Sequence, residues 1–406
     1  MILSANERAL WPFYAYRFMR GVFFLTTITL FVFFTEKGLT YTQGAILVAI
    51  ASLTQVASEL ITGSIADTYG RKGSVLLSLS IDAIVIALIA VTNSFWPLVV
   101  LFAIWGVSAT LASGADLAWA IDSFIERDES LLDAYYAKSR SFYNAGMIVA
   151  GILSSAVLMF YSNEVLWYVR AALTFVLALI LLIYAKEAFI KKTSVASLSL
   201  TLDTARDAVR VFRERSMIRV LAMASFFLFF ASFVAESVAV QDLKVQAGIP
   251  LEWWGLLLLI ATFLGLFTPH LGLTLSKRFA QAKHYLIACY VILIGLYGLA
   301  ITSMNMVFIA VLTVLYTVIN DFYEPVEEKL YNEHTPSAQR ASVNSLKSMI
   351  ENLGLLLGML LAGVLVDSWG GAATVSFAAI FILPAIVLLV LVRGSSRKQT
   401  QNSPRT

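Results

Sequence analysis

Residues 63–72 read Gly63-Ser64-Ile65-Ala66-Asp67-Thr68-Tyr69-Gly70-Arg71-Lys72, a short stretch that gathers one acidic and two basic side chains. It joins two apolar runs, at about residues 43–66 and 74–92. A helix needs about 20 mainly apolar residues to cross the hydrocarbon core of a bilayer, and both runs have about that length. We therefore expect a tight charged turn at a membrane surface, between two membrane-spanning helices.

The composition of the whole chain also indicates a membrane protein. Of 406 residues, 59% are hydrophobic and 14% are charged, and the mean hydropathy is +0.81. Soluble globular domains carry about 25% charged residues, so a water-soluble fold is excluded. The single cysteine, Cys289, falls inside an apolar run, which excludes a disulfide framework or a thiolate metal site within one chain.

Twelve apolar runs of spanning length follow one another along the chain. They lie at about residues 10–34, 43–66, 74–92, 96–121, 140–160, 165–188, 217–241, 253–275, 284–302, 305–325, 343–366 and 372–393. The sequence therefore predicts an all-α membrane protein with twelve transmembrane helices in two pseudo-symmetric six-helix bundles. The predicted units are an N-terminal bundle (1–190), a linker (191–216), a C-terminal bundle (217–394) and a polar tail (395–406).

The predicted linker contains a second kind of helical pattern. Apolar residues recur at spacings of three and four, with arginines on a neighbouring face: Leu202, Ala205, Val209 and Phe212 beside Arg206, Arg210 and Arg213. This pattern is typical of a helix that lies on a membrane surface. We expect it on the cytoplasmic leaflet.

The positions of lysine and arginine predict the orientation of the chain. With the N-terminus inside, the outer loops keep only Lys37 and Lys244, and three arginines, Arg17, Arg20 and Arg170, fall inside or at the edges of spans. The other basic residues, out of 29 in all, are then assigned to the inner side. Because basic loop residues are retained in the cytoplasm, we expect a multi-pass protein of the cell (inner) membrane with both termini cytoplasmic.

The pattern Gly63-x-x-x-Asp67-x-x-Gly70-Arg71-Lys72 resembles the signature between the second and third helices of the major facilitator superfamily. The resemblance implies a transporter that works by alternating access between two bundles, with this turn as a latch that holds the bundles together at the cytoplasmic side. The latch residues so implied are Gly63, Asp67, Gly70, Arg71, Lys72 and Asp122. In the simpler alternative, the two basic residues only obey the orientation rule.

Two departures make the chain an atypical relative of the drug/proton antiporters of that superfamily. Such proteins carry an arginine four residues before a helix-four glycine, but Phe102 precedes Gly106 here. They also carry a Gly-Pro pair in helix five, where this chain has Gly146 to Gly151 without proline. The direction of transport is left open by these departures.

An internal repeat is visible at an offset of 208 residues. The offset places Asp116 on Glu324, Asn144 on Asn352 and Gly146 on Gly354. The opening motif also has an echo at the outer end of the eleventh span, Gly363-x-x-x-Asp367-x-x-Gly370. Parallel halves with nested inverted repeats are typical of this transporter fold.

Charged residues inside spans cost at least about 2.5–3.5 kcal/mol each and need partners or a wet cavity. In the first half, Arg17, Arg20, Glu59 and Asp116 lie at a similar depth, which predicts a compensated network facing a central cavity. Such a network either couples transport to proton movement or only fixes packing. In the second half the candidates are Glu236, Asp321, Glu324 and Glu351. Glu351 is the first candidate for a titrating carboxylate or a cation site, with a protonated interhelical hydrogen bond as the alternative.

These observations predict a secondary active transporter, with proton-coupled efflux of a small amphipathic or cationic organic compound as the first hypothesis. The alternative is an uptake symporter or an uncoupled facilitator for a polar metabolite or lipid-like substrate. Nucleotide-binding and hydrolase motifs and a clustered histidine site are missing from the sequence, so we expect no enzyme, no cofactor and no metal. The expected partners are the substrate, protons and the lipid bilayer, with no nucleic acid, and the chain is expected to be a monomer.

Overall fold

The computed structural model describes residues 11–113, 115–125, 130–186, 210–336 and 339–392. Within these ranges it does not describe the side chains at 60–61, 63–69, 122–134, 137 and 341. All regular elements of the described residues are helical. The first half contains α2 (Trp11–Val22), η1 (Phe23–Thr26), α3 (Leu30–Glu36), α4 (Tyr41–Tyr69), α5 (Arg71–Val91), α6 (Phe95–Ala112), α7 (Ala115–Ile125), α8 (Ser130–Phe160) and α9 (Asn163–Tyr184). The second half contains α11 (Ser216–Phe233), η2 (Val234–Ala239), α12 (Val240–Gln246), α13 (Leu251–Leu264), α14 (Thr268–Ser276), α15 (Ala282–Leu299), α16 (Met306–His334), α17 (Arg340–Ala378), η4 (Ala379–Ile382) and α18 (Leu383–Leu391).

The prediction of twelve membrane-spanning helices is confirmed. By length and hydropathy alone, eight helices of the described residues qualify as spans, or ten with two bent pairs that break by 42° after Thr26 and by 44° after Leu264. The 29-residue helix α4 adds one more. Gly370, with φ of +78°, divides the apolar segment 342–391 into two spans, because a left-handed residue ends one helix before the next begins.

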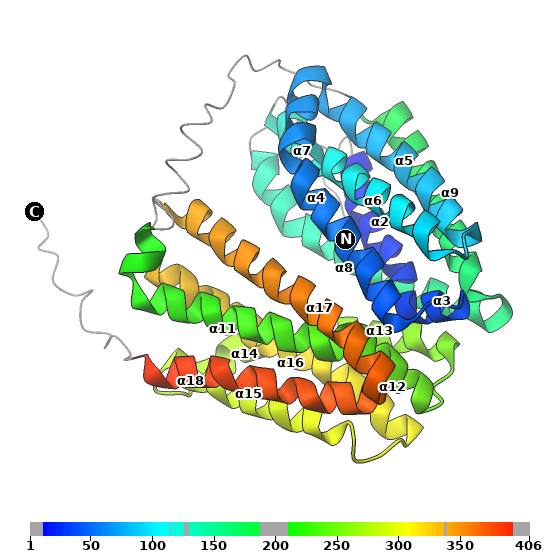
Figure 1. The fold of residues 1–406 in the computed structure, drawn as a ribbon. Coiled ribbons are helices and arrows are strands. Elements are labelled where there is room, and N and C mark those ends of the chain that lie inside the picture. Colours follow the sequence, from blue (N-terminus) through cyan, green and yellow to red (C-terminus); the bar gives the residue numbers. More distant parts are fainter. Residues whose placement is uncertain (1–10, 114, 126–129, 187–209, 337–338, 393–406) are drawn as a thin grey trace, which may run out of the picture.

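The helices form two bundles, one from each half of the chain (Figure 1). We call the end at which α9 stops and α11 starts the linker end, and the opposite end the far end. In Figure 1, α4 and α17 are close together near the far end and diverge toward the linker end. In the part of the chain that the structure describes, the two bundles therefore approach each other most closely toward the far end, which is the geometry of one state of an alternating-access fold.

Glycines at equivalent positions of the two halves lie at equivalent helix crossings. A Cβ on Gly146 of α8 would lie 2.0 Å from the carbonyl oxygen of Phe18 in α2, and a Cβ on Gly354 of α17 would lie 2.7 Å from that of Phe226 in α11. Each glycine thus lets the fifth helix of its half cross the first helix in backbone contact. The repeat at an offset of 208 residues corresponds here to a shared helix crossing.

Gly146→Ala is expected to lower the melting temperature of the purified protein. The new methyl group has no space beside Phe18, so α2 and α8 must separate, and overpacking of this kind costs about 1–3 kcal/mol. Gly295→Ala is the matched control, because a Cβ on Gly295 of α15 meets no atom within 4 Å. Equal melting temperatures of the two variants would contradict the proposed crossing.

Two predicted segments fall outside the description. Most of the segment 191–216, where a surface helix is expected, falls within residues 187–209, which the structure does not describe. The tail 395–406 lies beyond residue 392, the last residue described. Of the linker arginines, Arg210 is described and forms an ion pair with Glu214, with 2.8 Å between Nε and Oε1. Cys289 is buried in α15, inside a span as expected.

Candidate functional site

The two bundles are joined at the far end by the carboxylate of Asp367. Both of its oxygens accept backbone N–H groups at the start of α4, from Tyr41 at 2.9 Å and from Thr42 at 2.8 Å. A helix N-terminus leaves N–H groups unpaired and carries a partial positive charge, so it attracts an anion. A Cβ on Gly363 would lie 2.9 Å from the Cα of Thr42, so this glycine is what permits α17 to come so close to α4.

A second carboxylate, Asp242 of α12, supports the same closure. It accepts the hydroxyl of Tyr41 at 2.8 Å and the backbone N–H of Gly371 at 2.6 Å. The preceding residue, Gln241, also joins the halves, because its Oε1 accepts the N–H of Phe31 at 2.9 Å. Where both partners are described residues, the hydrogen bonds between the halves therefore lie at the far end.

A cavity of about 660 Å³ lies between the bundles. Aromatic and aliphatic side chains cover much of its wall, and the charged residues on that wall come from the second half. These residues are Glu236, Lys244, Glu324, Glu327, Glu328, Lys347 and Glu351. The cavity thus has an acidic character set by the second half alone.

Glu236 lies past the middle of the seventh span (Ser216–Gln246), toward the far end, in the short π-helical segment η2. Its Oε1 accepts the hydroxyl of Tyr297 at 2.5 Å, and its Oε2 accepts the side-chain amide of Asn320 at 3.0 Å. Among the described residues, no lysine, arginine or histidine lies within ion-pair distance of this carboxylate. Because π-helical segments redirect side chains and are frequent at functional sites, Glu236 is the carboxylate best placed to bind a proton or a cation.

Glu351 is not an unpaired acid, contrary to the expectation from the sequence. The Nζ of Lys347 lies 2.7 Å from the Oε1 of Glu351 and 3.9 Å from that of Glu327. Ser225 and Tyr290 also donate hydrogen bonds to Glu327, which is 5% exposed and not part of a solvated cluster. Lys347, counted with the basic residues of the inner side from the sequence, is 8% exposed because α17 begins at Arg340 and carries it into the bundle.

The other two acids predicted in the second half occupy different surroundings. Asp321 accepts the hydroxyl of Thr268 at 3.4 Å, away from the cavity wall. Glu324 is exposed and lines the cavity toward the linker end. Arg140 of the first half is near enough to act electrostatically on both acids.

The predicted network of the first half is only partly brought together. Arg17 pairs with Asp116 at 3.5 Å, and its Nε donates to the hydroxyl of Tyr135 at 3.3 Å. Arg20 interacts electrostatically with Asp116. Glu59 is exposed on α4 and forms no ion pair with a described residue. None of these four side chains is among those that line the central cavity.

Sequence reasoning missed a buried pair of the first half, Asp82 and Arg170. Both are less than 9% exposed and interact electrostatically. Arg170 also donates to Thr26 at 2.6 Å and lies 4.9 Å from the ring centroid of Trp105. The signal was available, because Asp82 is an acid in the middle of the apolar run 74–92.

The turn that opened the sequence argument is described in part. Gly70 has φ of +104°, a conformation that favours glycine and allows α5 to start at once. Arg71 donates to the carbonyl of Ala118 in α7 at 2.7 Å, and Lys72 donates to the last carbonyls of α9. The side chains of Asp67 and Asp122, and the surroundings of Gly63, lie outside the described residues, so the latch stays a prediction.

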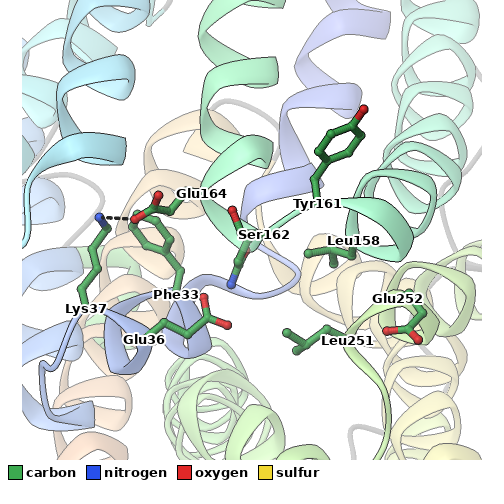
Figure 2. A pocket seen from close by; sticks show the side chains of 10 residues that line it. Phe33, Glu36, Lys37, Leu158, Tyr161, Ser162, Glu164, Leu251 and Glu252 are labelled. Carbon is green, nitrogen blue, oxygen red and sulfur yellow. Dashed lines mark hydrogen bonds and ion pairs between the residues drawn. The ribbon is translucent and has the colours of Figure 1, made fainter.

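A smaller cavity of about 390 Å³ lies at the far end, lined by both halves (Figure 2). Figure 2 shows Lys37 directed at Glu164, with 3.2 Å between Nζ and Oε1, while Glu36 and Glu252 project from different helices. Because its lysine is already paired with a carboxylate, this cavity has weaker means of binding a charged ligand than the central one.

Comparison with known proteins agrees with the architecture. Residues 10–325 match the family model described as Major Facilitator Superfamily. Two curated proteins of Bacillus subtilis (strain 168), the uncharacterized MFS-type transporters YxaM and YttB, are each 21% identical to this chain; the alignment with YxaM covers 94% of this chain and 95% of YxaM, and that with YttB covers 94% of each.

Solved structures show the same fold at lower sequence identity. The nucleoside transporter NupG is 17% identical, with a TM-score of 0.76 over 94% of this chain and 97% of NupG. A bacterial homologue of the lysosomal transporter Spinster, solved in an inward-facing occupied conformation, is 13% identical, with a TM-score of 0.74 over 96% and 97% of the two chains. Because the family model covers most of the chain and the twelve helices have its arrangement, this protein belongs to the Major Facilitator Superfamily of membrane transporters.

Proposed function

We propose that this chain is a secondary active transporter that exports a small amphipathic, cationic organic compound by alternating access, driven by protons that move inward. The observation that carries the proposal is Glu236, a carboxylate on the wall of the central cavity that is held by neutral donors and has no described cation as partner. An ionised carboxylate inside a span is costly without a positive partner. Glu236 therefore favours either a proton or the cationic group of a ligand.

The remainder of the cavity wall suits the apolar part of such a ligand. Aromatic rings from both halves line it, among them Phe31, Phe229 and Tyr316. Aromatic faces attract organic cations and bury apolar surface at the same time. The acids at the linker end, Glu324 and Glu328, add a negative field that concentrates cations at that end.

The direction of transport follows from the proposed orientation. The basic loops lie at the linker end, so we assign that end to the cytoplasm. In the described state the far end is closed by Asp367, and the acidic side of the cavity lies toward the linker end. A cation would thus enter from the cytoplasm, displace a proton from Glu236 and leave after the far end opens. One chain contains both bundles, so a monomer is sufficient for this cycle.

Glu236→Gln is expected to reduce ethidium-driven proton movement at least about tenfold, because the amide retains hydrogen bonding to Tyr297 but neither binds a proton nor carries charge. A loss of about 1.4 kcal/mol in cation binding already corresponds to tenfold. The measurement uses proteoliposomes that hold a pH-sensitive dye and an acidic lumen. Added ethidium should release lumenal protons through the wild-type protein.

The control for this experiment is Glu333→Gln, an exposed acid near the end of α16 that pairs with Lys329. Proteoliposomes with the Glu333→Gln variant should release protons at the wild-type rate. Wild-type rates in Glu236→Gln would overturn coupling through this residue. Failure of the wild-type protein to release protons with ethidium, tetraphenylphosphonium or phenylpropyltrimethylammonium would overturn the cation-exchange proposal as a whole.

A further inference from the structure

The central cavity contains a buried cation that the proposed proton and cation site does not use. Lys244 of α12 lies on the cavity wall near the far end and is 9% exposed. Its Nζ lies 3.8 Å from the ring centroid of Trp254, which also lines the cavity. Within the described residues, Lys244 has no carboxylate within ion-pair distance and Trp254 is its only side-chain partner.

The two acids that precede Lys244 most closely in the chain are already engaged. Asp242 accepts hydrogen bonds from Tyr41, Gln246 and the N–H of Gly371. Glu236 lies about 12 Å away along the helix axis, at 1.5 Å per residue, and is bound by Tyr297 and Asn320. The aromatic face holds the ammonium group without neutralising it, so an uncompensated positive charge borders the cavity.

The surroundings of this charge are fixed before any ligand binds. The indole N–H of Trp254 donates to the carbonyl of Ile249 at 3.1 Å. The next residue, Gly255, touches Gly151 of the other half, where an added Cβ would lie 2.1 Å from the carbonyl oxygen. Trp254 is thus anchored by its own loop and by the crossing of α8 and α13. A preformed site avoids the free-energy cost of ordering side chains when a ligand binds.

We propose that Lys244 and Trp254 form a binding site for the carboxylate of an amphipathic organic ligand in the central cavity. Apolar side chains around them, such as Phe31, Val240 and Leu257, would cover the body of that ligand. The inference rests on the proposed function in one respect, namely that Glu236, about 12 Å from Lys244 along the helix axis, binds a cationic group. A transported compound that uses both sites then carries a positive and a negative charge. The substrate class is then a zwitterion with an apolar body.

The same short helix places this site beside the closure of the far end. Gln241 and Asp242 of α12 bond to Phe31 and Tyr41 of the first half, one turn or less from Lys244. A carboxylate bound by Lys244 therefore acts on the element that holds the two bundles together. Ligand binding here would bias the equilibrium between the two states through differential affinity.

The test measures binding by thermal unfolding of the purified full-length protein in sodium gluconate buffer, with three ligands of one skeleton: hydrocinnamate, phenylpropanol and phenylpropyltrimethylammonium. Hydrocinnamate should protect the wild-type protein at a concentration at least about tenfold lower than phenylpropanol, because hydrogen bonds between charged groups are stronger than those of a neutral hydroxyl. Lys244→Met should remove this difference, and Lys244→Arg should retain it. Lys37→Met, at the far end but outside the central cavity, should behave as wild type.

Equal protection by hydrocinnamate and phenylpropanol in the wild-type protein would overturn the proposal without any variant. An unchanged preference of Lys244→Met for hydrocinnamate over phenylpropanol would overturn it as well. Thermal protection by chloride that depends on Lys244 would also overturn it, because the site would then bind a small inorganic anion. Protection by phenylpropyltrimethylammonium should depend on Glu236 and not on Lys244. If protection by phenylpropyltrimethylammonium did not depend on Glu236, the proposed function would be contradicted, but the carboxylate site at Lys244 would not.

Discussion

Lys347→Met is expected to destabilise the protein by about 3–5 kcal/mol, the usual cost of removing one partner from a buried ion pair. Lys347 is the described cation within 4 Å of two carboxylates, the partly buried Glu351 at 2.7 Å and the buried Glu327 at 3.9 Å. Methionine has nearly the same length but no charge, so two acids would remain together in a span without a counter-ion. The measurement is the yield of monodisperse protein and its melting temperature in detergent.

A matched control and a rescue variant make this result specific. Lys329→Met removes a lysine from an exposed pair on α16, with 3.9 Å between its Nζ and Glu333, and should change the melting temperature little. The triple variant Lys347→Met, Glu327→Gln and Glu351→Gln should recover most of the lost stability, because it has no uncompensated charge. Failure of the rescue would show that Lys347 acts by packing against Tyr331 and not by charge.

Asp367→Ala is expected to shift the protein toward states in which the far end is open. Two charge-assisted hydrogen bonds to the start of α4, from Tyr41 and Thr42, are lost together. Each bond to a charged group contributes about 1.5–3 kcal/mol, and a change of about 5.5 kcal/mol moves a two-state equilibrium from 1:99 to 99:1. A large part of the population should therefore change state. Asp367→Asn, which retains one acceptor, should have an intermediate effect.

The shift can be measured as a distance between spin labels on the two halves at the far end. Thr92→Cys and Ser303→Cys place labels after α5 and between α15 and α16, and the single native cysteine, Cys289, is buried. Longer distances should gain population in the Asp367→Ala protein. Glu252→Gln, a far-end acid in the first turn of α13, is the control and should retain the wild-type distribution. The same distribution in all variants would show that Asp367 does not hold the closure.

The echo of the opening motif could be found from the sequence, but its role could not. Gly363-x-x-x-Asp367-x-x-Gly370 repeats the spacing of residues 63–70. In the structure Gly363 permits close packing, Asp367 binds a helix N-terminus and Gly370 ends the helix with a positive φ. Only the fold shows which helix start lies opposite Asp367, because that partner is more than 300 residues away in the chain.

Charged residues show the limit of sequence reasoning most clearly. The sequence indicated Glu236 and Glu351 as candidates, since an acid in an apolar run stands out without any structure. It counted Lys347 with the basic residues of the inner side and left Glu351 unpaired, because the apolar run at 343–366 does not reveal that a lysine near the start of α17 faces these acids. Lys244 was likewise placed in an outer loop, although it borders the central cavity.

The sequence by itself determined the class of the protein, the twelve spans and the division into two halves. These depend on the length and polarity of local segments, because each helix that crosses the bilayer must be long enough, mainly apolar and hydrogen-bonded within itself. Only the tertiary structure decided which charges meet, which end of the bundles is closed and which side chains line the cavity. Those features depend on the rotation and tilt of twelve packed helices, and hydropathy places almost no constraint on either.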